Sequence, residues 1–92
     1  MVKLKNIHPG EILSEEFLLP LNITAYKLSK AIDIPQIIIY KIIKGSSRVN
    51  ADNAIWLSKC FGNTAKFWLG LQIDYDLENE NYKLKSLKIS LT

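Results

Sequence analysis

Residues 24–45 are punctuated as two short helices with a tight turn between them, and this pattern restricts how the rest of the chain can fold. Thr24 is a good N-cap residue for the first helix. Asp33, which tolerates a positive φ, and Pro35, which suits the first position of a helix, mark the turn into the second. Gly45 is a natural residue to close that second helix. This size and punctuation are typical of a helix-turn-helix.

The second helix of this pair is expected to have one buried side and one mixed outer side. Its isoleucines at 39, 42 and 43 have the spacing of a core-facing stripe. At about 100° per residue, this stripe also fixes the directions in which the other side chains of the helix point. Ile37, Lys41 and Lys44 point nearly opposite to the core, and Gln36, Ile38 and Tyr40 lie on the flanks.

The N-terminal part of the second helix in such a unit reaches into the DNA major groove, and Gln36 lies there. A glutamine amide can bind the N6/N7 edge of adenine, whereas Ile37 can only touch a thymine methyl group. Lys27, Lys30, Lys44 and Arg48 suit phosphates instead, although spacing alone is equally compatible with a solvated face. The residues predicted to contact DNA are Thr24, Lys27, Gln36, Ile37, Tyr40, Lys41, Lys44 and Arg48.

The charge is distributed unevenly, although the formal net charge is only +3. Residues 24–48 hold five lysines and arginines against Asp33 alone, and residues 49–82 hold two lysines against five acidic residues. One end of the protein therefore suits a polyanion and the other does not.

Three further helices are predicted around this pair. The first begins at Pro9 and stops near Pro20, the fourth is capped by Asn50 and closed by Gly62, and the fifth is capped by Thr64 and includes Tyr75. Along the fifth helix, four residues at helical spacing are expected to form core or dimer contacts: Phe67, Trp68, Leu71 and Tyr75. After Asn81 the sequence YKLKSLKISLT alternates apolar and basic residues, which favours either an edge strand or a frayed tail.

The length and composition fit one all-α domain over residues 1–92, with a core at about 7–80 and a tail at 83–92. The 48% of hydrophobic and 23% of charged residues are those of an ordinary globular protein. The chain lacks the apolar segment of a signal peptide and any stretch near the ~20 apolar residues of a membrane span, so we expect a cytoplasmic protein.

The sequence offers little for catalysis or for a metal site. His8 is the sole histidine and is expected to shape the entry to the first helix. Cys60 is the sole cysteine and is expected to be a small buried residue, because it can form neither an internal disulfide nor a multi-cysteine site. The acidic residues 74, 76, 78 and 80 lack the spacing and glycine of a calcium loop. We expect no enzyme activity, no metal and no cofactor.

Several separated blocks of sequence, in one order, carry a resemblance to a known family. They are HPGEIL, EEFL, LNIT followed by KLS, the Ile-Pro turn, the Lys44-Gly45 helix end, NADNA and FWLGLQIDYDLE, and they cover about residues 7–78. Together they resemble the HigA/VapI antitoxins of the Cro/repressor-like superfamily. The resemblance implies a five-helix, lambda-repressor-like fold. It also implies a homodimer that binds a palindromic operator in double-stranded DNA and neutralises a toxin similar to the HigB or RelE-type ribosome-dependent mRNA endonucleases.

Some positions depart from the family pattern. Ile37 and Ile38 stand where relatives commonly place polar residues, and Asp33 replaces the usual turn glycine. Trp56 stands where relatives often carry a basic residue, and it is expected either to make a protein contact or to be partly buried. Two hypotheses remain besides the DNA-binding antitoxin: a protein-interaction module of the same fold without operator recognition, and a solitary regulator without a toxin.

Overall fold

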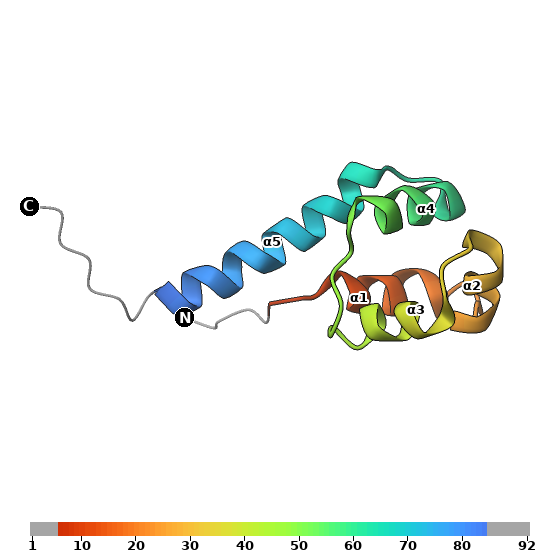
Figure 1. Ribbon diagram of the computed structural model, residues 1–92, viewed down its shortest axis with the longest axis horizontal. Helices are drawn as coiled ribbons and strands as arrows, with labels where there is room; N and C mark the ends of the chain where they lie inside the picture. Colours follow the sequence, from red (N-terminus) through yellow and green to blue (C-terminus); the bar gives the residue numbers. More distant parts are fainter. Residues whose placement is uncertain (1–5, 85–92) are drawn as a thin grey trace, which may run out of the picture.

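The computed structural model describes residues 6–84, and the elements within that range are all helical (Figure 1). A π-helical segment, η1, continues α1 without interruption, so the two form one helix and the predicted count of five is confirmed. The elements are α1 (Pro9–Ile12), η1 (Leu13–Leu18), α2 (Ala25–Ile32), α3 (Gln36–Ile43), α4 (Ala51–Phe61) and α5 (Ala65–Leu84). None of the helices in this range is long and apolar enough to cross a membrane.

Each of four helices begins at a side chain that accepts a hydrogen bond from a backbone N–H in the first turn. This arrangement satisfies a donor that the helix itself leaves free, and it confirms the predicted starts. The acceptors are His8 Nδ1 for Gly10 (2.9 Å), Thr24 Oγ1 for Lys27 (3.1 Å), Asn50 Oδ1 for Asn53 (2.8 Å) and Thr64 Oγ1 for Phe67 (3.0 Å).

The turn between α2 and α3 and the end of α3 follow the local chemistry of their residues. Asp33 adopts the left-handed conformation with φ 55°, as expected. Pro35 is the N-cap residue of α3 rather than its first helical residue, so the predicted start was one position early. After α3, Gly45 has φ 80°, and the N–H groups of Gly45 and Ser46 donate to the carbonyls of Ile42 and Lys41. These two bonds form a Schellman motif.

The last helix is longer than the sequence pattern predicted. It extends through Leu84, so the alternative of a strand is wrong for residues 82–84, and the rest of the predicted tail lies outside the described residues. Leucine and lysine are good helix formers, and no glycine or proline follows Gly70 within the helix to end it. Figure 1 shows the C-terminal half of α5 running out beyond the other helices.

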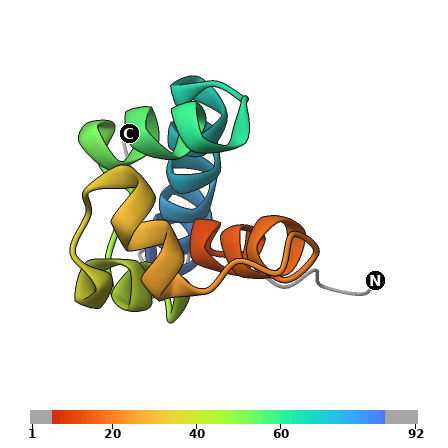
Figure 2. The ribbon, with the colours of Figure 1, turned by 90° about the vertical axis from the view of Figure 1, so that its right-hand side faces the viewer.

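The core lies between the five helices: α1 and α4 pack against α5, α3 packs against α1, and α2 packs against α3 and α4 (Figure 2). Trp68 is completely buried in it, and its indole N–H donates to Asn63 Oδ1 at 2.8 Å. The rings of Phe17, Phe61 and Phe67 lie around Trp68 at centroid distances of 5.1–6.3 Å. Side chains from every helix complete this core, among them Leu13, Leu28, Ile39, Ile42 and Leu57.

One close contact between helices depends on a glycine. A Cβ atom on Gly10 would lie 1.7 Å from the carbonyl oxygen of Ile42, so only glycine allows α1 to approach the backbone of α3 this closely. Cys60, in contrast, is exposed, and its predicted burial is wrong. The buried residues of α4 are Asn53, Ala54 and Leu57, and Cys60 lies one turn beyond Leu57, at the end of the helix, where the burial has ended.

Candidate nucleic-acid interface

The outer side of α3 is exposed, as the spacing of its isoleucines predicted. Ile39 and Ile42 are buried in the core, whereas the side chain of Ile37 is 60% exposed and those of Tyr40, Lys41 and Lys44 are also exposed. A groove of about 360 Å³ runs along this side, lined by Ile37, Tyr40, Lys41, Lys44 and Ser46. The outer side of α3 therefore combines two positive charges with apolar surface, which suits the phosphates and the thymine methyl groups of DNA.

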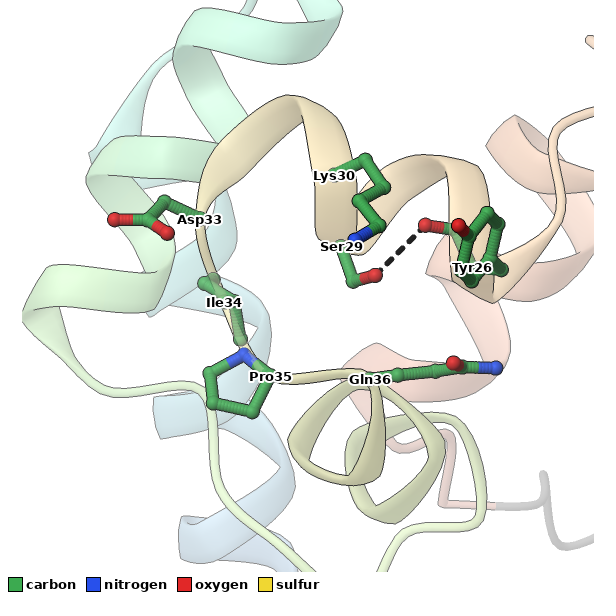
Figure 3. A pocket seen from close by; sticks show the side chains of 7 residues that line it. All are labelled: Tyr26, Ser29, Lys30, Asp33, Ile34, Pro35 and Gln36. Atoms are coloured by element: carbon green, nitrogen blue, oxygen red, sulfur yellow. Dashed lines mark hydrogen bonds between the residues drawn. The ribbon is translucent and has the colours of Figure 1, made fainter.

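A second hollow, of about 390 Å³, lies between α2 and the start of α3 (Figure 3). Gln36 extends along one of its walls, and Tyr26 and Lys30 form the opposite wall, with the Lys30 ammonium 5.3 Å from the Tyr26 ring centroid. Thr24 and Lys27 are exposed at the start of α2. Sequence reasoning missed Tyr26, although its spacing of four residues from Lys30 on α2 was a usable signal.

The loop between α3 and α4 carries Arg48, and α5 holds this loop in place. Arg48 pairs with Asp76 and does not extend freely into solvent, although its side chain is 64% exposed. Asp76 also accepts a hydrogen bond from Gln72 Nε2 at 3.0 Å, and Gln72 Oε1 accepts one from the backbone N–H of Val49 at 2.8 Å. Partial burial raises the pKa of Asp76, but the hydrogen bonds from Arg48 and Gln72 outweigh this effect, so its pKa lies below the ordinary value.

Similar proteins are found among curated sequences, although no family model matches the chain. Virulence-associated protein I of Dichelobacter nodosus is 39% identical over 83 residues, which are 90% of this chain and 77% of that protein. Antitoxin HigA-1 of Vibrio cholerae is 36% identical over 75 residues, 82% of this chain and 70% of its own length. The chain belongs to the HigA/VapI family.

A solved structure of a HigA protein supports the same assignment. The Pseudomonas aeruginosa antitoxin HigA, solved with the higBA promoter, superposes with a TM-score of 0.85 at 33% identity, over 95% of this chain and 98% of that one. The five-helix fold implied by the resemblance is thereby confirmed. The relatives are named as antitoxins and transcriptional regulators, not as enzymes.

The four residues of α5 predicted as core or dimer contacts face inward in this HigA/VapI protein, with one exception. Trp68 has no exposed surface, so it is a core residue that a second copy cannot touch. Leu71 is half-buried, and the half-buried ring of Tyr75 packs edge-on against His8 at a centroid distance of 4.8 Å. Phe67, which is 40% exposed, is the most accessible of the four.

The opposite side of α5 carries two further exposed apolar residues. Ile73 is 53% exposed and Leu77 is 57% exposed. Gly70 lies one turn before Ile73, and a Cβ atom there would meet nothing within 4 Å. Residues 70, 73 and 77 are spaced by three and four residues, so they form one stripe. We call Gly70, Ile73 and Leu77 the outer face of α5.

His8 and Trp56, the two remaining candidates, have clear environments. His8 caps α1, as expected, and burial lowers the pKa of its imidazole despite the opposing effect of nearby Asp76. Trp56 is exposed on α4 at the edge of a hollow of about 350 Å³, with the Lys59 ammonium 5.3 Å from its ring centroid. Of the two expectations for Trp56, the exposed indole agrees with the structure.

Proposed function

We propose that this protein is the antitoxin and autorepressor of a toxin-antitoxin pair, that it binds a palindromic operator as a dimer, and that it neutralises a toxin resembling HigB or RelE. The observation that carries the proposal is the outer side of α3, where Lys41 and Lys44 are exposed beside Ile37 while the opposite isoleucines are buried. The likeness to a HigA structure solved with promoter DNA supports it. The protein acts by binding in the cytoplasm, without catalysis and without a cofactor.

The DNA-contacting residues divide into two roles. Gln36, at the start of α3, reads an adenine edge through its amide, and Ile37 contacts a thymine methyl group. Lys41 and Lys44 on α3 and Lys27 on α2 bind phosphates or the groove edge, which adds affinity that falls with salt. Thr24, Tyr40 and Arg48 complete the surface at its margins.

The second copy binds the outer face of α5. A two-fold axis across an antiparallel pair of α5 helices places Ile73 of one copy against Leu77 of the other, and the same contact then occurs twice. Gly70 lets the two backbones approach closely because it has no side chain. Antiparallel pairing also brings Lys66 of each copy toward Glu80 of the other, whereas parallel pairing would place like charges together.

A substitution on this face tests the dimer. Leu77→Lys is expected to shift the protein to monomers in sedimentation experiments and to weaken operator binding, because one copy then contacts only one half-site. The matched control is Leu19→Lys, which alters a leucine of comparable exposure on the turn after η1. A Leu77→Lys protein that remains a dimer would place the interface elsewhere.

DNA titration at several salt concentrations tests operator recognition, with the DNA upstream of the gene compared with DNA of scrambled sequence. Gln36→Ala is expected to reduce the preference for the upstream sequence by about 1–3 kcal/mol. Lys44→Ala is expected to weaken binding to both DNAs equally and to reduce the salt slope by about 1. Salt-sensitive binding with no preference for the upstream DNA would favour the protein-interaction module instead.

The toxin partner requires a separate test. If a short reading frame beside this gene arrests growth when expressed alone, co-expression of this protein should restore growth, and the two products should co-purify. A specific DNA-binding protein without such a neighbour would be the solitary regulator.

A further inference from the structure

Two consecutive residues of the loop between α3 and α4, Arg48 and Val49, are each held by a side chain of α5. The carboxylate of Asp76, on α5, pairs with the guanidinium of Arg48. The amide of Gln72, also on α5, accepts the backbone N–H of Val49. This short loop follows the proposed DNA-reading helix directly, and its position is therefore set largely by α5.

The contacts from α5 form one continuous chain of hydrogen bonds. Gln72 is buried, with 1% of its surface exposed, and both ends of its amide are used: the oxygen accepts from Val49 and the nitrogen donates to Asp76. The two oxygens of Asp76 are divided between Gln72 and Arg48. Because Gln72 cannot turn without breaking a buried bond, it fixes the carboxylate of Asp76, and the carboxylate in turn fixes Arg48.

Arg48 can contact a second anion while it remains paired with Asp76. A guanidinium carries five N–H donors, and the pairing with Asp76 is made through one terminal nitrogen. The side chain of Asp76 is only 33% exposed, whereas that of Arg48 is 64% exposed, so Arg48 is the more accessible member of the pair. A free arginine loses much side-chain freedom when it binds a phosphate, and an arginine already held loses less.

We propose that Asp76 and Gln72 are positioning residues for DNA binding, which hold Arg48 ready to contact a backbone phosphate and thereby link α5 to the DNA-binding side of the protein. The proposal rests on the proposed function, because it requires that DNA is the ligand. On charge alone, Asp76 would be expected to weaken DNA binding, because its carboxylate repels phosphates. The proposal instead gives it a favourable role through Arg48.

Three roles of Asp76 predict different results when it is removed. If Asp76 positions Arg48, its removal weakens DNA binding only while Arg48 is present. If Asp76 acts mainly by repelling phosphates, its removal strengthens binding. If it only supports the fold, its removal weakens binding to the same degree whether or not Arg48 is present.

A double-mutant cycle separates these roles, with the DNA upstream of the gene as the probe. Asp76→Ala is expected to weaken binding about two- to tenfold in the otherwise unchanged protein, which corresponds to ordering one long side chain at an interface. In an Arg48→Ala background, the same substitution should cause no weakening. Lys44→Ala is the matched background, because Lys44 is a predicted phosphate contact that no described hydrogen bond or ion pair joins to Asp76, and there the weakening should persist.

The cycle uses Asp76 because Gln72→Ala would also leave the buried backbone N–H of Val49 without its acceptor. Thermal melting of each variant identifies any loss of folding, and Asp76→Asn, which keeps the shape and an acceptor for Gln72, replaces Asp76→Ala if that protein is unstable. Equal weakening in the Arg48→Ala background, or tighter binding by Asp76→Ala, would overturn the proposal while the proposed function stands. Failure of the unsubstituted protein to bind this DNA would overturn the proposed function and the positioning role with it.

Discussion

Replacing Gly10 by alanine should destabilise the protein, although alanine is ordinarily the better residue in a helix. The added Cβ atom would lie 1.7 Å from the Ile42 carbonyl oxygen, 2.5 Å from its carbon and 2.9 Å from the Ile43 Cα atom. All three neighbours are backbone atoms in the last turn of α3, so no side-chain rotation can relieve the overlap. The two helices must separate instead.

The size of the effect follows from two opposing contributions. Forcing one extra carbon into a close-packed contact costs about 1–3 kcal/mol or more, and rigid backbone neighbours favour the upper end of that range. The better helix propensity of alanine offsets at most about 1 kcal/mol. The net loss is therefore at least about 2 kcal/mol, and for a domain of this size it lowers the melting temperature by roughly 8–16 °C.

The assay is thermal unfolding followed by circular dichroism, at one protein concentration for every variant. Glu16→Ala is the matched control, because it introduces alanine at an exposed position of η1, in the same helix as Gly10. It should change the free energy of unfolding by less than about 0.5 kcal/mol. If Gly10→Ala melts at the same temperature as the unsubstituted protein or higher, the proposed close packing of α1 on α3 is refuted.

Two further outcomes concern polar groups near the loop between α3 and α4. Gln72→Ala removes the acceptor of the buried Val49 N–H, and it should lower the free energy of unfolding by about 1–3 kcal/mol in denaturant titrations; an unchanged midpoint would mean that water or another group replaces the amide. Burial lowers the pKa of His8 below 6.5, so below that pH the unfolded chain binds more protons than the folded protein. The contribution of His8 is thus complete above about pH 6.5 and is lost as the pH falls through the window beneath it. His8→Asn, which keeps a capping acceptor, should lose less stability than the unsubstituted protein between about pH 7.5 and 5.5, and equal losses would contradict this assignment.

The starts of the helices could be predicted from the sequence because capping is local. Thr24, Asn50 and Thr64 each act on an amide three residues ahead, so the signal and its effect lie within one turn. The same holds for the left-handed Asp33 and for Gly45 after α3. The outer side of α3 could also be predicted, since Ile39, Ile42 and Ile43 form a single core-facing stripe.

The orientation of α5 could be predicted only in part: the inward-facing stripe was expected from its helical spacing, but the spacing left open whether it forms core or dimer contacts. Apolar residues lie on both sides of this helix: Trp68, Leu71 and Tyr75 form one stripe, and the outer face forms the other. Periodicity alone does not say which stripe forms the core and which is left for a second copy, and the choice depends on aromatic partners from η1 and α4. Gln72 was missed for a related reason, because its partner Val49 is 23 residues away and belongs to a loop.

The two tryptophans experience opposite surroundings, and this difference has a practical value. Trp68 is sealed among phenylalanines, whereas Trp56 faces solvent on α4. The emission of Trp68 should shift to longer wavelength only when the hydrophobic interior opens. Trp56, which is already in contact with water, should respond instead when something covers α4. Native fluorescence of the two single-tryptophan variants can therefore report unfolding and surface occupancy separately, without an attached dye.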